Sequence, residues 1–270
     1  MSIEKYAVIG NPIEHSKSPL IHQAFARQFG KQIHYERLLS PLDGFSSTIK
    51  RLQAEGYIGA NVTVPFKFEA YQLSYPNLTE RALSAGEAVN TLTFTATDIQ
   101  GDNTDGIGLR NDIEGNLGFE IRGKNILILG AGGAAHGVLM SLVGANSLTI
   151  ANRTLAKALK MITGLYHDYD VRAVEYENLN VRYDLIVNAT SAGLTDSALP
   201  LPDRIFSSDT LAYDMMYGRE TPFMHQARTA GAQVADGLGM LVEQAAEAFY
   251  LWHGLRPATS PVIAAIRQQR

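Results

Sequence analysis

Residues 125–135, NILILGAGGAA, constrain the fold of this chain more than any other segment. An uncharged run at residues 126–129 leads directly into a glycine turn and then into residues that favour a helix. Gly130 allows the tight turn out of the strand, Gly132 lets backbone amides approach a pyrophosphate, and Ala135 keeps the helix close to the sheet. Unpaired N–H groups at such a helix start favour phosphates. The segment predicts a dinucleotide-binding βα turn, with a tight turn that binds no nucleotide as the alternative.

A second short strand is predicted at residues 148–151, at the spacing that a βαβ unit requires. Asn152, Arg153 and Thr154 follow it, with Lys157 one turn further on. A site for NAD usually has an acidic residue here to bind the ribose 2′-hydroxyl, and this segment has none. Arginine and lysine instead fit a 2′-phosphate, so NADP(H) is preferred over NAD(H). The alternative is that Thr154 caps a helix whose solvated face carries both cations.

Composition narrows the classes of function. The formal net charge is −4 and there is no basic run, which argues against nucleic acid as the main partner. No apolar stretch is long enough to cross a bilayer, and the first ten residues do not resemble a signal peptide, so we expect no membrane partner and a cytoplasmic location. The absence of cysteine excludes disulfides and thiol chemistry. The seven histidines show no metal-ligand spacing, so no catalytic metal is expected.

Hydrophobic periodicity divides the chain into two α/β regions. In the first region, strands are predicted at residues 6–9, 34–38, 59–62 and 91–96, and helices at 19–29 and 45–55. In the second, strands at 126–129, 148–151, 184–187 and 211–213 alternate with helices in the doubly wound pattern. Helices predicted at 238–252 and 260–270 are expected to fold back onto the first region. We therefore expect a first domain of residues 1–104 with the helices of residues 238–270, and a Rossmann domain of residues 105–237.

Lys67 occupies an unusual position after a predicted strand of the first region. In NVTVPFK, residues 61–67, Pro65 suits the first position of a helix, which places Lys67 in the first helical turn. The helix dipole disfavours a cation there, so Lys67 is expected to have a compensating partner or ligand. The alternative is an ordinary surface lysine.

Four further polar residues lie at the starts of predicted helices or on a helix face. Asp105, in GDNTDG, precedes a helix predicted from about Ile107 and suits an N-terminal cap. Ser16 and Ser18 lie just ahead of another helix, where capping and carboxylate binding are both open. Gln244 lies on the apolar face of the last long helix, where a polar amide needs a partner, either a ligand or a group of the core.

Together with the glycine turn, these clusters resemble the shikimate dehydrogenase family. The matching stretches follow the family's order along nearly the whole chain: GNPIEHSKSPLIH, GANVTVPFK, AVNTL, GDNTDGIG, GAGGAA, NRT, NATSAG, YDMMYGRETPF and DGLGMLVEQAA. The resemblance implies reversible NADPH-dependent reduction of 3-dehydroshikimate to shikimate, on the route to chorismate and the aromatic amino acids. It also implies an α/β fold in which an N-terminal substrate-binding domain closes on a doubly wound, Rossmann-type NADP-binding domain, with the active site in the cleft between them.

The resemblance also assigns roles to individual residues. Lys67 would be the catalytic acid that protonates the carbonyl oxygen, and Asp105 would orient its ammonium group. The substrate-binding set comprises Ser16, Ser18, Thr63, Lys67, Asn90, Asp105, Tyr217 and Gln244. The cofactor-binding set comprises Gly130, Ala131, Gly132, Gly133, Ala134, Asn152, Arg153, Thr154, Lys157, Met215 and Gly237. The expected partner is a small-molecule substrate, no metal is implied, and the chain is expected to be a monomer or a homodimer.

Two alternatives stay open. The quinate/shikimate dehydrogenase branch accepts quinate and often uses NAD, and the missing acid after the second Rossmann strand counts against it. A non-catalytic NADP-binding or regulatory module on the same fold is the other, because a fold does not determine a function. The presence of both Lys67 and Asp105 counts against this second alternative.

Overall fold

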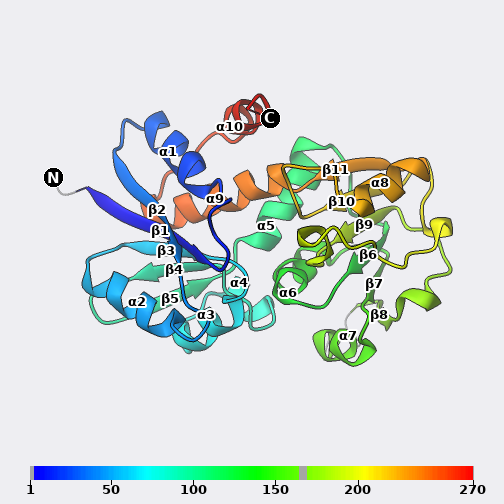
Figure 1. Ribbon diagram of the computed structural model, residues 1–270, viewed down its shortest axis with the longest axis horizontal. Coiled ribbons are helices and arrows are strands. Elements are labelled where there is room, and N and C mark those ends of the chain that lie inside the picture. The colour runs from blue at the N-terminus through cyan, green and yellow to red at the C-terminus, as the bar shows by residue number, and fades with distance from the viewer. Residues whose placement is uncertain (1–2, 164–168, 270) are drawn as a thin grey trace. The chain divides into compact units, whose positions relative to one another are not determined.

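The computed structural model describes residues 3–163 and 169–269 of the chain (Figure 1). These residues form two compact units. The described part of Met1–Gly108 and Leu241–Arg270 makes up unit 1, and that of Leu109–Met240 makes up unit 2. The boundaries fall inside helices α5 (Asp105–Arg110) and α9 (Leu238–His253).

Unit 1 is built on a five-stranded mixed sheet with the strand order β2-β1-β3-β4-β5. Strand β1 (Glu4–Gly10) is parallel to β2 (Ile33–Leu39) and β3 (Gly59–Val62), and β4 (Thr91–Phe94) and β5 (Ile99–Asp102) extend the sheet with antiparallel pairing. Its other helices are α1 (Ser18–Gln28), α2 (Phe45–Ala54), α3 (Lys67–Ser74), α4 (Glu80–Ser84) and α10 (Ser260–Arg267).

Side chains of β1 alternate between two cores, as the twofold period of a strand requires. Ala7 and Ile9 belong to a core with residues of α2 and α3, whereas Tyr6 and Val8 pack on the opposite face, against Trp252 of α9. Figure 1 accordingly shows α2 and α3 on one side of the sheet and α1 and α9 on the other. The sheet of unit 1 is therefore covered on both faces, which explains why its central strands are so apolar.

Unit 2 is a six-stranded parallel sheet with the order β11-β10-β9-β6-β7-β8. The strands are β6 (Asn125–Leu129), β7 (Ser147–Ala151), β8 (Val171–Val174), β9 (Leu185–Asn188), β10 (Leu211–Asp214) and β11 (Gln233–Asp236). The helices are α6 (Gly133–Leu139), α7 (Leu155–Ile162) and α8 (Pro222–Thr229), with short helical segments η1 (Asn111–Asn116), η2 (Met140–Leu142), η3 (Tyr176–Asn178), η4 (Ala192–Leu194) and η5 (Asp203–Ile205). Numbered along the chain, the six strands lie in the doubly wound order 3-2-1-4-5-6. The predicted Rossmann-type α/β fold is confirmed.

The uncharged run of β6 is explained by burial on both faces of this sheet. Ile126 and Ile128 pack into the core that holds α6 and α7, and Leu127 and Leu129 pack into the core that holds α8. A central parallel strand covered on both sides has no position where a polar side chain would reach water.

Several predicted elements begin or end at other residues. The strand predicted at 91–96 ends at Phe94, because the chain turns there and the Thr95 N–H donates to the Asp98 carbonyl oxygen (2.9 Å). The helix expected from about Ile107 begins at Asp105. The helix predicted at 260–270 ends at Arg267, and Arg270 lies outside the described residues.

The prediction for Pro65 is wrong in detail. Helix α3 begins at Lys67, and Pro65 lies in the turn that precedes it. This turn is closed by a hydrogen bond from the Phe66 N–H to the Thr63 carbonyl oxygen (3.0 Å), so the chain becomes helical two residues later than expected. Lys67 nevertheless lies in the first helical turn.

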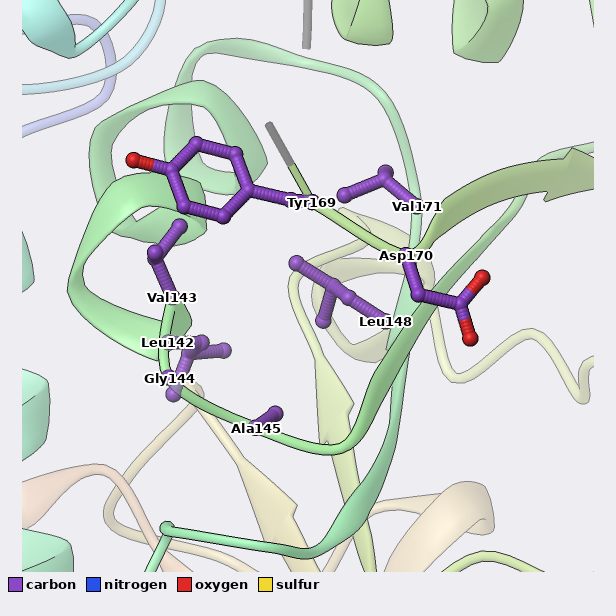
Figure 2. Close-up of a pocket in the computed structure, with 8 residues that line it drawn as sticks. All are labelled: Leu142, Val143, Gly144, Ala145, Leu148, Tyr169, Asp170 and Val171. Atoms are coloured by element: carbon purple, nitrogen blue, oxygen red, sulfur yellow. The ribbon is translucent and has the colours of Figure 1, made fainter. Parts of the chain in front are cut away.

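A pocket of about 280 Å³ lies in unit 2, at the amino-terminal ends of β7 and β8. Figure 2 shows its lining, which is mainly apolar: Leu142, Val143, Gly144, Ala145, Leu148, Tyr169, Asp170 and Val171. Doubly wound sheets bind nucleotides at the carboxyl ends of their strands, so this pocket is not the predicted cofactor site.

Residues 3–163 and 169–269 contain neither a membrane-spanning helix nor a cluster of metal-ligating side chains. No helix in these ranges is long and apolar enough to cross a membrane. They also contain no group of three or more metal-ligating side chains that could hold an ion.

Candidate active site

Lys67 and Asp105 form a buried ion pair in unit 1. Lys67 is the first residue of α3 and Asp105 the first of α5, and the Lys67 Nζ donates to Asp105 Oδ2. The two side chains are only 12% and 8% exposed. A cation in the first turn of a helix opposes the helix dipole, and the carboxylate of Asp105 supplies the compensating charge.

Asn90 holds the other carboxylate oxygen of Asp105. Its side-chain Nδ2 donates to Asp105 Oδ1 (2.8 Å) and to Thr104 Oγ1 (3.0 Å), and its Oδ1 accepts the Thr104 N–H (2.8 Å). Asn90 immediately precedes β4, and Thr104 follows β5. The antiparallel register that pairs Thr91 with Asp102 brings these two strand ends together. Both oxygens of Asp105 therefore have side-chain partners.

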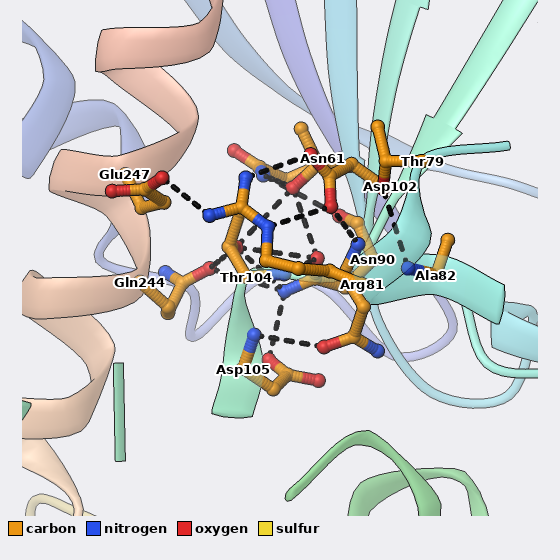
Figure 3. Close-up of polar contacts among 12 residues, drawn as sticks. Asn61, Thr79, Arg81, Ala82, Asn90, Asp102, Thr104, Asp105, Gln244 and Glu247 are labelled. Atoms are coloured by element: carbon orange, nitrogen blue, oxygen red, sulfur yellow. Dashed lines mark hydrogen bonds and ion pairs between the residues drawn. The ribbon is translucent and has the colours of Figure 1, made fainter. Parts of the chain in front are cut away.

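Gln244 of α9 joins the same group of polar side chains (Figure 3). Its Nε2 donates to the Leu241 carbonyl oxygen (2.7 Å), and its Oε1 makes long contacts with Asn90 Nδ2 (3.4 Å) and Thr104 Oγ1 (3.5 Å). Helices α5 and α9 come very close here: a Cβ placed on Gly108 would lie only 2.7 Å from the backbone nitrogen of Gln244. Glycine at position 108 therefore sets how near Gln244 lies to the Asn90 amide.

Asn61 and Thr104, which were not predicted as site residues, extend this network. Asn61 Oδ1 accepts from the Tyr35 hydroxyl (2.7 Å), and its Nδ2 donates to Thr91 Oγ1 (3.1 Å). Asn61 is buried within β3. An amide inside a predicted buried strand was a signal that the sequence carried, since such a group needs internal partners.

Ser16, Ser18 and Thr63 follow strands β1 and β3, which are parallel and so end at the same edge of the sheet. Ser18 is the first residue of α1 and its N–H donates to Ser16 Oγ (3.3 Å), while the two hydroxyl groups are 3.2 Å apart. Thr63 directly follows β3, and its N–H donates to the Ile9 carbonyl oxygen (2.9 Å). The N-cap residue of α1 is Lys17, which makes no side-chain capping hydrogen bond, so the bond to Ser16 Oγ is the local role of these hydroxyls, and their binding of a carboxylate stays a prediction.

The glycine turn of unit 2 has the geometry that its sequence predicts. Gly130 has φ +104°, a conformation that favours glycine, whereas no atom lies within 4 Å of a Cβ placed on Gly132. Helix α6 begins at Gly133, and Ala135 is fully buried against the sheet. The backbone before α6 is therefore open to an approaching group, as a pyrophosphate site requires.

Positive charge lies exposed beyond the end of β7. Arg153, Thr154 and Lys157 are exposed, and Asn152 Nδ2 donates to the Thr154 carbonyl oxygen (2.9 Å). Thr154 occupies the N-cap position of α7 but makes no side-chain capping hydrogen bond. Residues 152–157 contain no carboxylate, so their chemistry fits a 2′-phosphate better than a 2′-hydroxyl.

Asp214 organises the carboxyl end of β10. It is fully buried and accepts hydrogen bonds from Thr221 Oγ1 (2.5 Å), Asn188 Nδ2 (3.1 Å) and the Met216 N–H (2.9 Å). Burial raises the pKa of Asp214, although these hydrogen bonds oppose the rise. The carboxyl group therefore fixes the start of the loop that follows the strand.

That loop carries two of the predicted site residues, Met215 and Tyr217. A Cβ placed on Gly237 would lie 2.3 Å from the Met215 carbonyl oxygen, so only glycine lets the chain after β11 pass this close. Tyr217 belongs to unit 2, and its predicted part in closing the substrate pocket stays a prediction.

Three family profiles match consecutive parts of the chain. The substrate binding domain of shikimate dehydrogenase matches residues 8–92, shikimate / quinate 5-dehydrogenase matches residues 113–195, and the C-terminal domain of shikimate 5'-dehydrogenase matches residues 237–267.

Individual relatives agree with these profiles. A shikimate dehydrogenase (NADP(+)) from Methylobacillus flagellatus is 57% identical, over 98% of this chain and 99% of the relative. The crystal structure of an Ael1 enzyme from Pseudomonas putida superposes with a TM-score of 0.89 at 46% identity, over 97% of each chain. Shikimate 5-dehydrogenase from Thermus thermophilus, solved in complex with NADP(H) and shikimate, gives a TM-score of 0.86 at 32% identity, over 99% of this chain and 100% of that one. The chain therefore belongs to the shikimate dehydrogenase family.

Proposed function

We propose that this chain catalyses the reversible, NADPH-dependent reduction of 3-dehydroshikimate to shikimate, on the route to chorismate and the aromatic amino acids. The observation that carries the proposal is the buried Lys67–Asp105 pair, in a chain whose relatives are named NADP(+)-dependent shikimate dehydrogenases. Interconversion of a carbonyl and a hydroxyl group needs a proton donor within hydrogen-bond reach of the oxygen. A buried lysine with a fixed partner suits that task.

The substrate is assigned mainly to unit 1, whose profile match is to a substrate binding domain. Shikimate is a carboxylate with several ring hydroxyls, so it needs donors at one end and mixed donors and acceptors around the ring. The Ser16 and Ser18 hydroxyls are assigned to the carboxylate. The ring hydroxyls and the reacting carbonyl are assigned to Thr63, Lys67, Asn90, Asp105 and Gln244, with Tyr217 closing the pocket.

The cofactor is assigned to unit 2. The open backbone at Gly132 fits a pyrophosphate, and the exposed cations at 153 and 157 fit a 2′-phosphate. Bound NADPH would supply the hydride that reaches the carbonyl carbon. Ala131, Ala134, Met215 and Gly237 complete the proposed cofactor-binding set, together with the other residues that the resemblance assigns to it.

Lys67 then acts as the acid. An ammonium group has three N–H donors, and Asp105 Oδ2 takes one of them, which leaves donors for the carbonyl oxygen of the substrate. As negative charge develops on that oxygen, the proton moves to it from Lys67 Nζ, and solvent restores the ammonium afterwards. In the reverse direction the neutral amine accepts the hydroxyl proton. Asp105 keeps the amine pointed in one direction throughout.

The two alternative functions are less well supported. The relative from Methylobacillus flagellatus is named for NADP(+), and residues 152–157 lack the acid that NAD binding favours, which argues against the quinate branch that uses NAD. A binding module without catalysis would have no need of a buried lysine paired with a carboxylate. The proposal also includes a cytoplasmic location and a monomeric or homodimeric state, as the sequence leads us to expect.

The test measures absorbance at the nicotinamide band, with shikimate and quinate each offered with NADP and with NAD. The proposal expects rapid NADPH formation with shikimate. Turnover of quinate with NAD would move the chain to the other branch, and no reaction in any of the four would indicate a binding module.

The matched variants are Lys67→Ala and Lys50→Ala, the latter an exposed lysine of α2. Loss of a general acid should lower kcat by about 10²- to 10⁴-fold in Lys67→Ala, with a smaller change in the shikimate KM. Lys50→Ala should retain wild-type rates. Unchanged turnover in Lys67→Ala would remove Lys67 from the mechanism.

A further inference from the structure

Arg81 lies between two carboxylates that belong to different parts of unit 1 (Figure 3). Its Nε and Nη2 donate to the two oxygens of Asp102 (3.1 and 2.8 Å), and its Nη1 donates to Glu247 Oε1 (2.5 Å). Each carboxylate side chain is only 5% exposed, whereas Arg81 is 35% exposed. One guanidinium group thus joins the end of β5 to the middle of α9.

The Asp102 side of this bridge leads directly to the proposed catalytic carboxylate. Asp102 Oδ1 also accepts the Asn103 N–H (2.6 Å), and Asn103 Oδ1 accepts the Asp105 N–H (3.0 Å). Asn103 Nδ2 donates to the Ala88 carbonyl oxygen (2.7 Å). The turn between Asp102 and Asp105 is therefore held by a continuous series of hydrogen bonds that begins at Arg81.

The Glu247 side leads to the substrate-facing amide. Glu247 lies one helical turn beyond Gln244 on the same helix, so the two side chains share one face of α9. Gln244 Oε1 lies at the edge of hydrogen-bond reach from Asn90 and Thr104, at 3.4 and 3.5 Å. A small displacement of α9 would break these contacts, and a small displacement toward α5 is prevented by the close approach at Gly108.

Arg81 is itself held in place. Thr79 caps α4 by accepting the Ala82 N–H (3.3 Å), and the Thr79 N–H donates to the Gly101 carbonyl oxygen of β5 (3.0 Å). Burial alone would lower the pKa of Arg81, but its hydrogen bonds with Asp102 and Glu247 raise it above the ordinary value, so the guanidinium stays charged. Glu247 forms a further ion pair, with Arg256 (2.8 Å). Among the described residues, the ion pair of Asp102 is with Arg81 alone.

We propose that Arg81 is a positioning residue, which fixes the distance between the turn that carries Asp105 and the turn of α9 that carries Gln244. This inference rests on the proposed function, in which both residues surround the substrate. A bridge between two buried carboxylates adds little net stability, because desolvation offsets much of the attraction, but it restricts geometry strongly. The planar fork of arginine can bind Asp102 through two nitrogens while a third reaches Glu247, and lysine cannot do this.

The test compares Arg81→Ala and Arg81→Lys with wild type in steady-state kinetics, with thermal unfolding as a check on folding. Because the substrate site would lose its fixed geometry, the KM for shikimate should rise about tenfold in Arg81→Ala, as expected for loss of a charged hydrogen-bond partner. The KM for NADP, which is assigned to unit 2, should change less than about twofold. Arg81→Lys should fall in between. Arg51→Ala is the matched control, since Arg51 forms an exposed pair with Glu55 in the same unit and should leave both constants unchanged.

Chemical rescue distinguishes positioning from general support of the fold. Millimolar guanidinium should lower the shikimate KM of Arg81→Ala most of the way back to the wild-type value, while equal concentrations of sodium chloride should not. A lower kcat or a lower melting temperature with an unchanged shikimate KM would overturn the proposal, and so would failure of guanidinium to rescue a folded variant. If Arg81→Ala does not fold, Arg81→Lys takes its place in the test. A raised KM for shikimate with an unchanged KM for NADP would then support the proposal, and an unchanged KM for shikimate would overturn it. If wild type itself does not oxidise shikimate, the proposed function fails and this inference fails with it.

Discussion

Replacement of His22 by phenylalanine should reduce the pH dependence of the stability of unit 1. His22 of α1 is fully buried and stacks on Tyr35, with ring centroids 4.3 Å apart. Burial, and then the neighbouring charge of His253, lower the pKa of His22 from 6.5 to about 3. In the unfolded chain the same group titrates near its ordinary pKa, so between these values only the unfolded state binds the proton. Stability from neutral His22 is therefore fully present above pH 6.5 and is lost as the pH falls toward 3.

The magnitude follows from the two pKa values. Below pH 6.5 each pH unit costs about 1.4 kcal/mol, so lowering the pH from 7 to 5 should reduce the free energy of unfolding by about 2 kcal/mol through His22 alone. Phenylalanine keeps a flat ring on Tyr35 and cannot take up a proton. The difference in unfolding free energy between wild type and His22→Phe should therefore change by about 2 kcal/mol over this range, in favour of the variant at low pH.

Urea unfolding followed by tryptophan fluorescence measures this difference. Trp252 is the one tryptophan of the chain, and its ring lies 5.4 Å from that of His22, so its emission reports on unit 1. The matched control is His34→Gln, because the side chain of His34 is more than half exposed in the same unit. A plot of its free energy of unfolding against pH should stay parallel to that of wild type. Parallel curves for His22→Phe as well would refute the argument, because they would mean that His22 binds protons equally in both states.

Three further substitutions test other parts of the molecule. Arg153→Ala should raise the KM for NADP about tenfold or more and that for NAD far less, because only NADP carries the 2′-phosphate, and equal increases would contradict the assignment. Gly108→Ala should lower the free energy of unfolding in urea by about 1–3 kcal/mol and raise the shikimate KM, since its Cβ would lie 2.7 Å from the backbone nitrogen of Gln244. An unchanged shikimate KM would show that α9 can move away without disturbing the site. Tyr213→Phe should lower the free energy of unfolding by about 1–3 kcal/mol, because the buried carboxylate of Asp112 loses a 2.6 Å hydrogen bond. Urea unfolding followed by circular dichroism measures this change, and an unchanged free energy of unfolding would contradict the prediction.

The strands that sequence reasoning missed all lie at the edges of sheets. Strands β8 and β11 are the two ends of the sheet in unit 2, and β5 is one end of the sheet in unit 1. Each is only partly buried and includes polar residues, as in QVAD of β11 and IQGD of β5. The central strand β6, by contrast, is an uncharged run, because both of its faces are covered. An edge strand packs against fewer neighbours, so its sequence carries a weaker pattern.

The chemistry of the site was more visible in the sequence than its geometry. Lys67 stood out because a cation in the first turn of a helix is unfavourable, and Gln244 because an amide lay on an apolar face. Nothing local indicated that Arg81 would reach Glu247, which lies 166 residues away in the chain. Arginine on a short helix and glutamate on a long one look like ordinary surface residues until the fold brings them together.

Asn90 shows why the site needs one particular residue type at its centre. The position must donate to a carboxylate oxygen of Asp105 and also accept the backbone N–H of Thr104. A carboxamide offers both a donor and an acceptor at the end of one short side chain. Aspartate at this position would place a second negative charge beside Asp105, and leucine would leave the buried backbone N–H of Thr104 without this acceptor. Because Asn90 satisfies one oxygen of Asp105, the other remains directed at Lys67, so the amide determines where the proton donor of the proposed reaction points.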